Sequence, residues 1–294
     1  MKKSFGYYLL MMVTKPMQLL PLEFHYVVSD FLYFFVYYIF NYRKKAVKEN
    51  LRKSFPEKSK KELIHIERKF YHHFVDIFIE TLYLTHITQK RHSKRLIFEN
   101  KELIDQLYDK GKSIICVTGH YGNWEFSRLF SVHVKHRLYA IYKKLNSPIF
   151  DRFFKDIRSK DGANLLEMRQ TYKQLINDTK NGIKYFAAFF ADQRPLKSEI
   201  QYWMNFLNQD TPVLMGTEKI AKKTNAAVVY AEMQRVKRGY YKIAFKLITE
   251  APELNEEYEI TSLFMRELEK AIRRSPEFWL WTHKRWKHQR NITT

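Results

Sequence analysis

Several residue types are scarce in this chain of 294 residues, and each shortage excludes a class of protein. The single cysteine, Cys116, excludes a disulfide framework and a cysteine zinc site. It lies in an apolar run that predicts a buried strand, where we expect a small packed side chain instead of a nucleophile. No internal repeat occurs, and no apolar run reaches the roughly 18–20 uninterrupted residues of a confident membrane-spanning helix.

Acidic residues are also few relative to basic ones. The chain has 52 Lys and Arg against 31 Asp and Glu, a net charge of +21. Because self-repulsion of such a surplus destabilises a compact state, we expect an anionic partner: nucleic acid, an anionic membrane, or an acidic or phosphorylated substrate. The densest aromatic run, residues 31–40, carries no charge, whereas nucleic-acid readers place aromatics among basic residues. The membrane is therefore favoured and no nucleic acid is expected.

Residues 1–55 combine apolar stretches with basic residues and are predicted to form membrane-anchoring helices. A cleavable signal peptide is not indicated, because Lys-Pro at residues 15–16 replaces the small residues of a cleavage site. The basic cluster at residues 43–45 suits the cytoplasmic side of an anionic membrane. An interfacial anchor and one marginal span over residues 24–40 are both open, and the alternative is a pair of core helices.

From residue 95 onward apolar strands alternate with helical patterns. This alternation predicts an α/β catalytic domain over residues 56–294, with a mainly parallel sheet flanked by helices and an antiparallel addition near the C-terminus. Ligands bind beyond the carboxyl ends of strands in such sheets, so the segments that follow two of these strands, residues 119–125 and 192–194, mark the candidate site. The expected strands cover 114–118, 137–142, 185–191, 227–234 and 240–249, and the expected helices cover 60–86, 101–109, 123–133, 147–159, 172–180, 211–223 and 257–274.

The segment Gly-His-Tyr-Gly-Asn-Trp-Glu at residues 119–125 is the first candidate for chemistry. On a continuous helix His120 and Glu125 would be roughly 140° out of phase, so they converge only if the chain bends. Gly119 and Gly122 permit that bend where a strand gives way to a helix. We expect Glu125 to hold one ring nitrogen of His120, leaving the other free to act as a general base for a hydroxyl.

This segment looks like the His-x4-Glu block of the late acyltransferases of lipid A biosynthesis, and more distantly like the His-x4-Asp block of glycerolipid acyltransferases. The resemblance spans nearly the whole chain. Two positions depart from the family pattern: Lys143 stands where an arginine is frequent, and residues 206–208 replace Phe-Phe-Gly. The matching blocks are Tyr42-Arg43, Asn50-Leu51, Phe55-Pro56-Glu57, Glu99-Asn100, Arg158 with Gly162, Ala191-Asp192-Gln193-Arg194, and residues 276–287.

The resemblance implies acyl transfer from the thioester of an acyl carrier protein, or of CoA, to a hydroxyl of a lipid A precursor. It places the enzyme on the cytoplasmic face of the bacterial inner membrane and requires no metal and no organic cofactor. His120 would be the general base, oriented by Glu125. Arg158 would offset the oxyanion of the tetrahedral intermediate. The alternative for Arg158 is an ordinary basic residue on a solvated helix face.

Four further residues are implied substrate contacts: Asn123, Lys143, Asp192 and Arg194. Asp192 and Arg194 would position a phosphorylated acceptor or brace the site, and the alternative is an ion pair that caps the strand. The acceptor is open between a lipid A precursor and another lipid, such as an amino-acid lipid, a glycolipid or a lysophospholipid. A non-catalytic basic protein that binds membranes or nucleic acid is the rival of another class.

Four basic clusters are candidate contacts for anionic partners. For each cluster taken alone, a solvated face is the alternative. They are Arg43-Lys44-Lys45, Lys219 with Lys222 and Lys223, Arg235 with Lys237 and Arg238, and Lys284 with Arg285 and Lys287.

Overall fold

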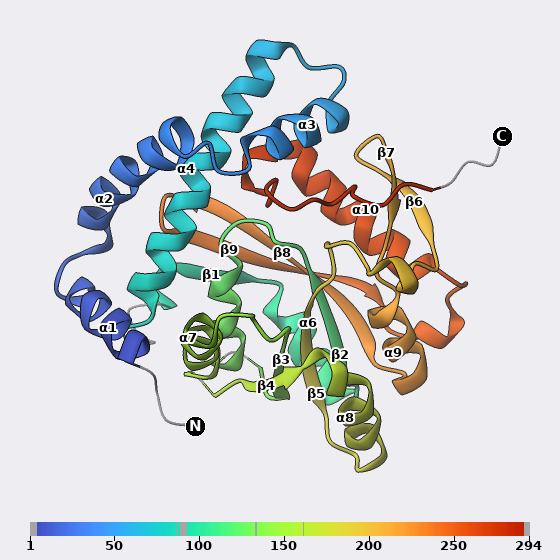
Figure 1. The fold of residues 1–294 in the computed structure, drawn as a ribbon. Coiled ribbons are helices and arrows are strands. Elements are labelled where there is room, and N and C mark those ends of the chain that lie inside the picture. Colours follow the sequence, from blue (N-terminus) through green and yellow to red (C-terminus); the bar gives the residue numbers. More distant parts are fainter. Residues whose placement is uncertain (1–4, 87, 89–92, 133, 161, 291–294) are drawn as a thin grey trace.

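A seven-stranded sheet forms the centre of the molecule in the computed structural model, which describes residues 5–86, 88, 93–132, 134–160 and 162–290 (Figure 1). The strand order is β1–β9–β8–β2–β5–β3–β4. The strands are β1 (Leu96–Glu99), β2 (Ile114–Thr118), β3 (Arg137–Tyr142), β4 (Asn164–Glu167), β5 (Tyr185–Phe190), β8 (Ala227–Lys237) and β9 (Tyr240–Thr249). A separate antiparallel pair is formed by β6 (Trp203–Phe206) and β7 (Gln209–Pro212).

The α-helices are α1 (Phe5–Thr14), α2 (Leu22–Phe34), α3 (Lys44–Ser54), α4 (Lys60–Leu84), α6 (Lys101–Asp109), α7 (Pro148–Ser159), α8 (Met168–Lys180), α9 (Gly216–Thr224) and α10 (Glu259–Arg274). The shorter 3-10 segments are η1 (Lys15–Leu19), η3 (Trp124–Val132), η4 (Lys197–Glu199), η5 (Pro252–Leu254) and η6 (Pro276–Phe278). A π-helical turn, η2 (Phe35–Ile39), extends α2.

The sheet confirms the expected α/β class and its mainly parallel pairing. β2 pairs in parallel with both β5 and β8, and the β8–β9 hairpin supplies the expected antiparallel part. Every residue of β2 is buried, because helices cover both faces of the sheet. Ile115 and Val117 pack into a core with α8, α9 and α10, whereas Ile114 and Cys116 pack on the other side with α6 and η3. Cys116 is thus the packed side chain that its apolar surroundings predict.

Two expectations about local structure are corrected. The helix expected over residues 211–223 begins only at Gly216, because Thr211 and Pro212 pair with Met204 and Trp203 in the β6–β7 hairpin. The helix expected over 123–133 is the 3-10 segment η3, and its last expected residue, His133, lies outside the described residues. Thr-Pro is a helix-start signal, but pairing with the preceding strand β6 overrides it.

The long helix α4 holds the N-terminal helices against the sheet. It begins after Ser59, whose side chain forms a capping box with Glu62. Further along, the buried carboxylate of Asp76 accepts a hydrogen bond from Ser29 of α2 at 2.7 Å. Arg238, at the β8–β9 turn, donates to the same carboxylate at 2.6 Å. A buried acid needs such partners, so α2, α4 and the hairpin are fastened together at Asp76.

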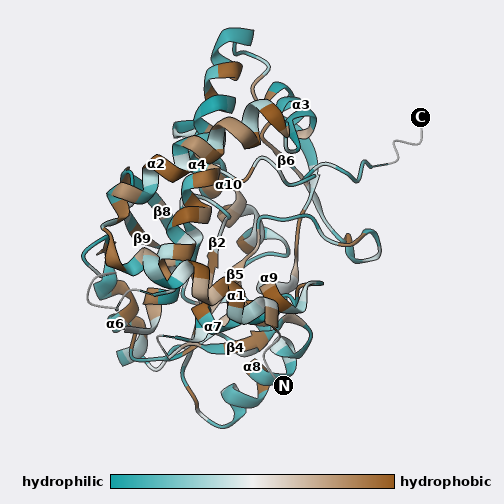
Figure 2. Cartoon of the chain, turned by 60° about the vertical axis from the view of Figure 1, so that its left-hand side comes forward, coloured by the Kyte–Doolittle hydropathy of each residue, from teal (hydrophilic) through white to brown (hydrophobic). Residues whose placement is uncertain are grey.

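The N-terminal helices α1 and α2 lie along one side of the molecule and are blue in Figure 1. Most of the exposed large hydrophobic side chains belong to residues 5–42, and Figure 2 shows hydrophobic stretches on α2. Among them, Phe24 is 61% and Phe31 is 63% exposed. Among the described residues, no helix combines the length and the apolar character that crossing a membrane requires.

Candidate active site

The chain bends sharply where β2 ends, and two glycines make the bend possible. Gly122 adopts a left-handed conformation with φ of +63°, and its N–H donates to the carbonyl of Phe278 at 2.9 Å. A Cβ on Gly119 would lie 2.7 Å from Leu268 of α10. Gly122 therefore supplies the bend that the sequence predicts, whereas Gly119 allows the close approach of α10, which was not predicted.

The carboxylate that holds His120 belongs to Asp192, which follows the end of β5. Its Oδ1 is 2.6 Å from Nδ1 of His120, and its Oδ2 accepts the backbone N–H of His120 at 2.8 Å. The indole N–H of Trp279 donates to the same Oδ2 at 2.9 Å. The Asp192 side chain is 2% exposed and that of His120 is 17% exposed. The buried carboxylate therefore fixes the position of His120, whose ring remains partly exposed.

The ionised form of Asp192 is favoured in the folded protein. Burial alone would raise its pKa, but the charge of His120 and hydrogen bonds from His120 and Trp279 lower the pKa to about 2. The Asp192 carboxylate accepts a hydrogen bond from the N–H at Nδ1 of His120, so the lone pair of the neutral imidazole lies on Nε2. The amide nitrogen of Gln193 lies 3.3 Å from Nε2. Nε2 is thus the atom of this histidine that can take a proton from a substrate.

Glu125 binds Arg158 and not His120, contrary to the expectation from their spacing. Arg158 Nη2 donates to Glu125 Oε1 at 2.6 Å, and Nε donates to Oε2 at 3.2 Å. The guanidinium lies on α7, and its side chain is 31% exposed, whereas that of Glu125 is 5% exposed. Burial would lower the pKa of Arg158, but the charge and hydrogen bonds of Glu125 raise it. The expected His120–Glu125 pair is therefore replaced by two pairs, His120 with Asp192 and Glu125 with Arg158.

The two pairs are joined by aromatic side chains and a small cavity. The ring of His120 contacts Trp124 and Phe190, with centroid distances of 5.2 and 5.0 Å. Both aromatics also line a cavity of about 30 Å³ that reaches Glu125 and Arg158. This volume holds about two water molecules. The rest of its wall combines two polar residues, Ser127 and Arg128, with apolar ones: Phe130, Leu138, Ala140, Ile141, Ala163 and Ala188.

Asn123 stabilises the turn after β2 through two hydrogen bonds of its side chain. Its amide donates to the buried carboxylate of Glu80 at 2.6 Å, and its side-chain oxygen accepts the backbone N–H of Glu125 at 3.1 Å. Glu80 also accepts hydrogen bonds from Tyr26 of α2 and Tyr241 of β9, at 2.7 and 2.8 Å. Asn123 is fully buried, so this geometry assigns it to positioning the turn. No local signal marks Glu80, because its three partners come from three separate segments.

The other two predicted contacts lie at the edges of the site. Lys143 is exposed after β3 and lines a narrow crevice together with Arg158. Arg194 lies two residues beyond Asp192, and its Nη1 is 2.9 Å from Nε2 of His288. In the described ranges, no group of three or more His, Cys, Asp or Glu side chains is placed to hold a metal ion.

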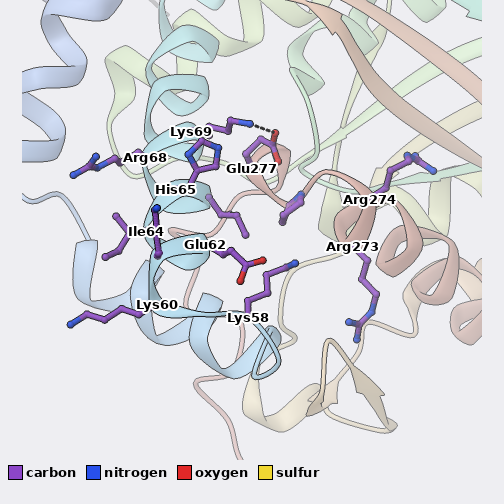
Figure 3. Close-up of a pocket in the computed structure, with 13 residues that line it drawn as sticks. Lys58, Lys60, Glu62, Ile64, His65, Arg68, Lys69, Arg273, Arg274 and Glu277 are labelled. Atoms are coloured by element: carbon purple, nitrogen blue, oxygen red, sulfur yellow. Dashed lines mark ion pairs between the residues drawn. The ribbon is translucent and has the colours of Figure 1, made fainter.

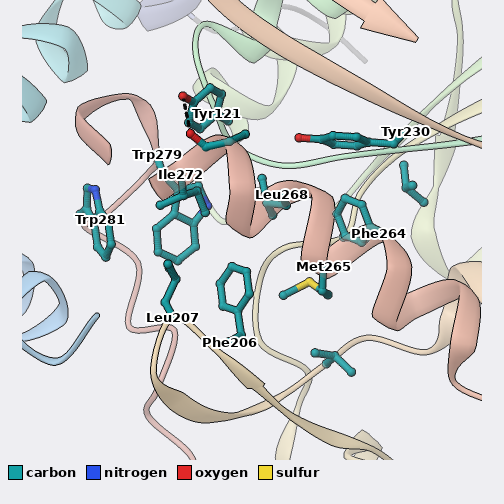
Figure 4. Close-up of a cluster of buried hydrophobic side chains, with 14 of the residues drawn as sticks. Tyr121, Phe206, Leu207, Tyr230, Phe264, Met265, Leu268, Ile272, Trp279 and Trp281 are labelled. Atoms are coloured by element: carbon teal, nitrogen blue, oxygen red, sulfur yellow. Dashed lines mark hydrogen bonds between the residues drawn. The ribbon is translucent and has the colours of Figure 1, made fainter. Parts of the chain in front are cut away.

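The C-terminal segment closes the site from one side. Trp279 pairs with Tyr121 in an isolated β-bridge, and the N–H of Leu280 donates to the carbonyl of His120 at 3.1 Å. Asn50 of α3 donates to the carbonyls of Trp281 and His283, at 2.9 and 3.1 Å. Figure 4 shows Trp279 and Trp281 within a cluster of buried side chains that includes Tyr121. The early and closing blocks of the sequence are thus in direct contact.

A comparison with known families supplies the context for this site. Residues 1–288 match the model of the family described as bacterial lipid A biosynthesis acyltransferases. The chain belongs to this family. A comparison with curated proteins gave no match. Family membership implies an acyltransferase of lipid A biosynthesis and confirms the family that the sequence resembles.

For this lipid A acyltransferase family member, the low pKa of Asp192 predicts a pH-dependent contribution to stability. The carboxylate has a pKa of about 2 when folded and about 3.9 when unfolded, so its stabilising effect is complete above about pH 4 and is lost as pH falls toward 2. Asp192→Asn should reduce the free energy of unfolding by on the order of 2 kcal/mol at pH 5, and by less at pH 3. Urea unfolding at both pH values measures this difference.

Asp105→Asn serves as the control, because Asp105 forms a surface pair with Lys101 on α6. Its effect should stay below about 1 kcal/mol at both pH values. An equal loss for Asp192→Asn at pH 3 and pH 5 would contradict the assigned role of the anion.

Proposed function

We propose that this protein transfers a fatty acyl chain from the thioester of an acyl carrier protein, or of CoA, to a hydroxyl of a lipid A precursor. The observation that carries the proposal is the pairing of His120 Nδ1 with the buried anion of Asp192 at 2.6 Å. This pairing leaves Nε2 as a base beside an opening in the site. Family membership supplies the reaction class, and the pairing supplies a group that can start it.

The reaction follows from this geometry in two steps. Nε2 of His120 removes the proton of the acceptor hydroxyl while the oxygen attacks the thioester carbonyl, forming a tetrahedral oxyanion. Asp192 stabilises the imidazolium. Collapse of the intermediate breaks the carbon–sulfur bond, and the imidazolium returns its proton to the departing thiolate. The products are the acylated lipid and the free thiol, and His120 is again neutral.

Arg158 is suited to stabilise the oxyanion. Glu125 engages its Nε and Nη2, which fixes the guanidinium and leaves Nη1 outside those two bonds. A preorganised donor of this kind typically contributes about 10²–10³-fold to turnover.

His120→Ala should lower acyl transfer by at least about 10³-fold, because both base catalysis and the proton donor for the thiolate are lost. The assay combines acyl carrier protein or CoA thioesters with candidate lipid acceptors, and mass spectrometry reads the acylated product. His72→Ala, on the half-exposed surface of α4, is the matched control and should transfer normally.

Full activity of His120→Ala would rule out the base assignment and favour a non-catalytic role. The same assay distinguishes a lipid A precursor from an amino-acid lipid, a glycolipid or a lysophospholipid as acceptor, because each acceptor gives a product of different mass.

Residues 1–55 are proposed to anchor the catalytic domain, residues 56–294, to the cytoplasmic face of the inner membrane. Tyr26 and Ser29 fasten α2 to the buried acids of α4, while Phe24 and Phe31 on the same helix remain exposed. An exposed apolar patch of this kind typically marks a membrane or protein contact. Tyr7 of α1 also donates to Asp156 of α7, the helix that carries Arg158, at 2.5 Å. The lipid acceptor would therefore approach near the site.

Replacing both Phe24 and Phe31 with Asp should weaken binding to vesicles of phosphatidylethanolamine and phosphatidylglycerol by at least tenfold. Burying one Phe side chain contributes about 1.5–3 kcal/mol, and the new charges add repulsion. Flotation of the protein with vesicles measures the bound fraction. Leu254→Asp is the control, because Leu254 is 82% exposed on η5, outside the N-terminal helices. Equal vesicle binding by all three proteins would disprove the anchor.

A basic groove of about 960 Å³ is the proposed docking surface for the acidic carrier protein. It lies between the start of α4 and the end of α10, and Figure 3 shows its basic side chains. Lys58, Lys60 and Lys61 form no ion pair within the described part of the chain. The opposite wall includes Pro276 and Glu277, and the next residue, Phe278, accepts the N–H of Gly122. The groove therefore borders the segment that supports the catalytic turn.

The double variant Lys61→Glu with Lys69→Glu should raise KM for a carrier-linked acyl donor by about tenfold, while KM for acyl-CoA changes little, because only the acidic protein covers the groove. The matched control is Lys173→Glu with Lys180→Glu, two exposed positions on α8. Equal effects of the two double variants would show that overall charge, and not the groove, attracts the donor.

A further inference from the structure

A cluster of two arginines and two histidines lies beside the His120–Asp192 pair; its members are Arg194, His283, Arg285 and His288. Arg194 comes from the segment after β5, two residues beyond Asp192, and the other three come from the segment after Trp279. Arg194 Nη1 lies 2.9 Å from His288 Nε2, and the N–H of Arg285 donates to the carbonyl of His283 at 2.9 Å. The cluster therefore joins the two segments that already meet at the carboxylate of Asp192.

Arg285 is fully buried, yet most of its hydrogen-bonding capacity is unused. Its Nη1 donates to the carbonyl of Pro212 at 2.7 Å. Within the described part of the chain, its Nε and Nη2 and the Nε of Arg194 are buried without a hydrogen-bond acceptor. A buried guanidinium with open donors is strongly unfavourable unless an anion or another acceptor reaches it.

The surrounding charges leave this cluster with a positive excess. Asp192 is the acid whose charge acts on Arg285 and His283, and its oxygens already accept hydrogen bonds from His120 and Trp279. Burial lowers the pKa of His283 to about 4; the charge of Asp192 opposes this, while Arg285 and Arg194 add to the lowering. His283 is therefore neutral near pH 7. Two guanidinium groups thus face one saturated carboxylate, which is an environment that attracts a further anion.

We propose that Arg194 and Arg285 bind a phosphate group of a substrate next to His120, with His283 and His288 as neutral neighbours. This inference rests on the proposed function, and it names the anion that the cluster would hold. Two substrates carry a phosphate near the reacting atoms: a phosphorylated lipid acceptor, and a donor whose thiol arm is phosphopantetheine. Guanidinium groups match the geometry of phosphate oxygens better than ammonium groups do.

Binding of inorganic phosphate to the purified full-length protein tests the site without any reaction. Arg194→Gln should weaken phosphate binding about tenfold, as measured by titration calorimetry at fixed ionic strength, because a charged donor pair is lost. Arg290→Gln is the matched control, since Arg290 is exposed on the same C-terminal segment and pairs with Asp210. Arg285→Lys retains a buried positive charge that can donate toward Pro212. It loses the planar set of guanidinium donors and should therefore also weaken phosphate binding.

Kinetic measurements identify the source of the phosphate. If the acceptor supplies it, Arg194→Gln raises KM about tenfold for the phosphorylated lipid but leaves KM for the phosphatase-treated lipid unchanged. If the donor supplies it, the same increase appears with an acyl-phosphopantetheine and is absent with an acyl-pantetheine. In either case kcat should change less than twofold, because the variant leaves His120 and Asp192 in place.

Two outcomes would overturn the proposal. One is phosphate binding of equal strength in the wild type, Arg194→Gln and Arg290→Gln, which would mean that phosphate binds as an adventitious ion only. The other is a KM increase of the same size for substrates with and without phosphate. If the wild type transfers no acyl chain, the proposed function fails, whereas phosphate binding that depends on Arg194 would still support the anion site.

Discussion

The carboxylate of Asp192 is the point on which the arrangement of the site depends. It is buried, and it accepts hydrogen bonds from the backbone and ring of His120 and from the indole of Trp279. A buried anion without these donors would be strongly destabilising, so the segments that carry them must meet. The end of β5, the turn after β2 and the C-terminal segment are consequently held in one geometry. The same contacts that satisfy the anion also set the tautomer and the orientation of the histidine.

Buried acids repeat this role behind the site. Glu80 joins Asn123, in the turn after β2, to Tyr26 of α2 and Tyr241 of β9. Burial raises the pKa of Glu80, and the hydrogen bonds from these side chains oppose that rise. Asp76, one helical turn earlier on α4, fastens α2 to the β8–β9 hairpin. The helix that exposes Phe24 and Phe31 is therefore linked through α4 to the segment that carries Glu125.

The runs of basic residues along the sequence do not show where the net charge of +21 is exposed on the folded protein. Each of the four clusters along the chain has at least one member engaged within the protein. Arg43 donates to Thr282, Lys222 to Asn255, and Arg238 to Asp76, while Arg285 is buried. The groove combines Lys58, Lys60 and Lys61 with three basic residues that pair with acids: Lys69 with Glu277, Arg273 with Glu269, and Arg274 with Glu232. Such a surface exists only after folding, because its two walls are some two hundred residues apart in the chain.

Local patterns in the sequence were enough to determine much of the scaffold. Alternating apolar runs predicted β2, β3, β5 and the β8–β9 hairpin, and Gly119 and Gly122 predicted the bend that carries His120. These features depend on backbone conformation and on which face of a strand is apolar, and both are properties of neighbouring residues. The β6–β7 hairpin was missed because Thr211-Pro212 resembles a helix start. The short strands β1 and β4 were missed because their stability comes from pairing with distant segments.

The partner of His120 was missed for the same reason. Spacing along the chain favoured Glu125, but β5 lies beside β2 in the sheet and brings Asp192 to the histidine, while α7 brings Arg158 to Glu125. Only the tertiary structure decides such pairs, because a carboxylate binds the donor nearest in space, whatever its distance in sequence.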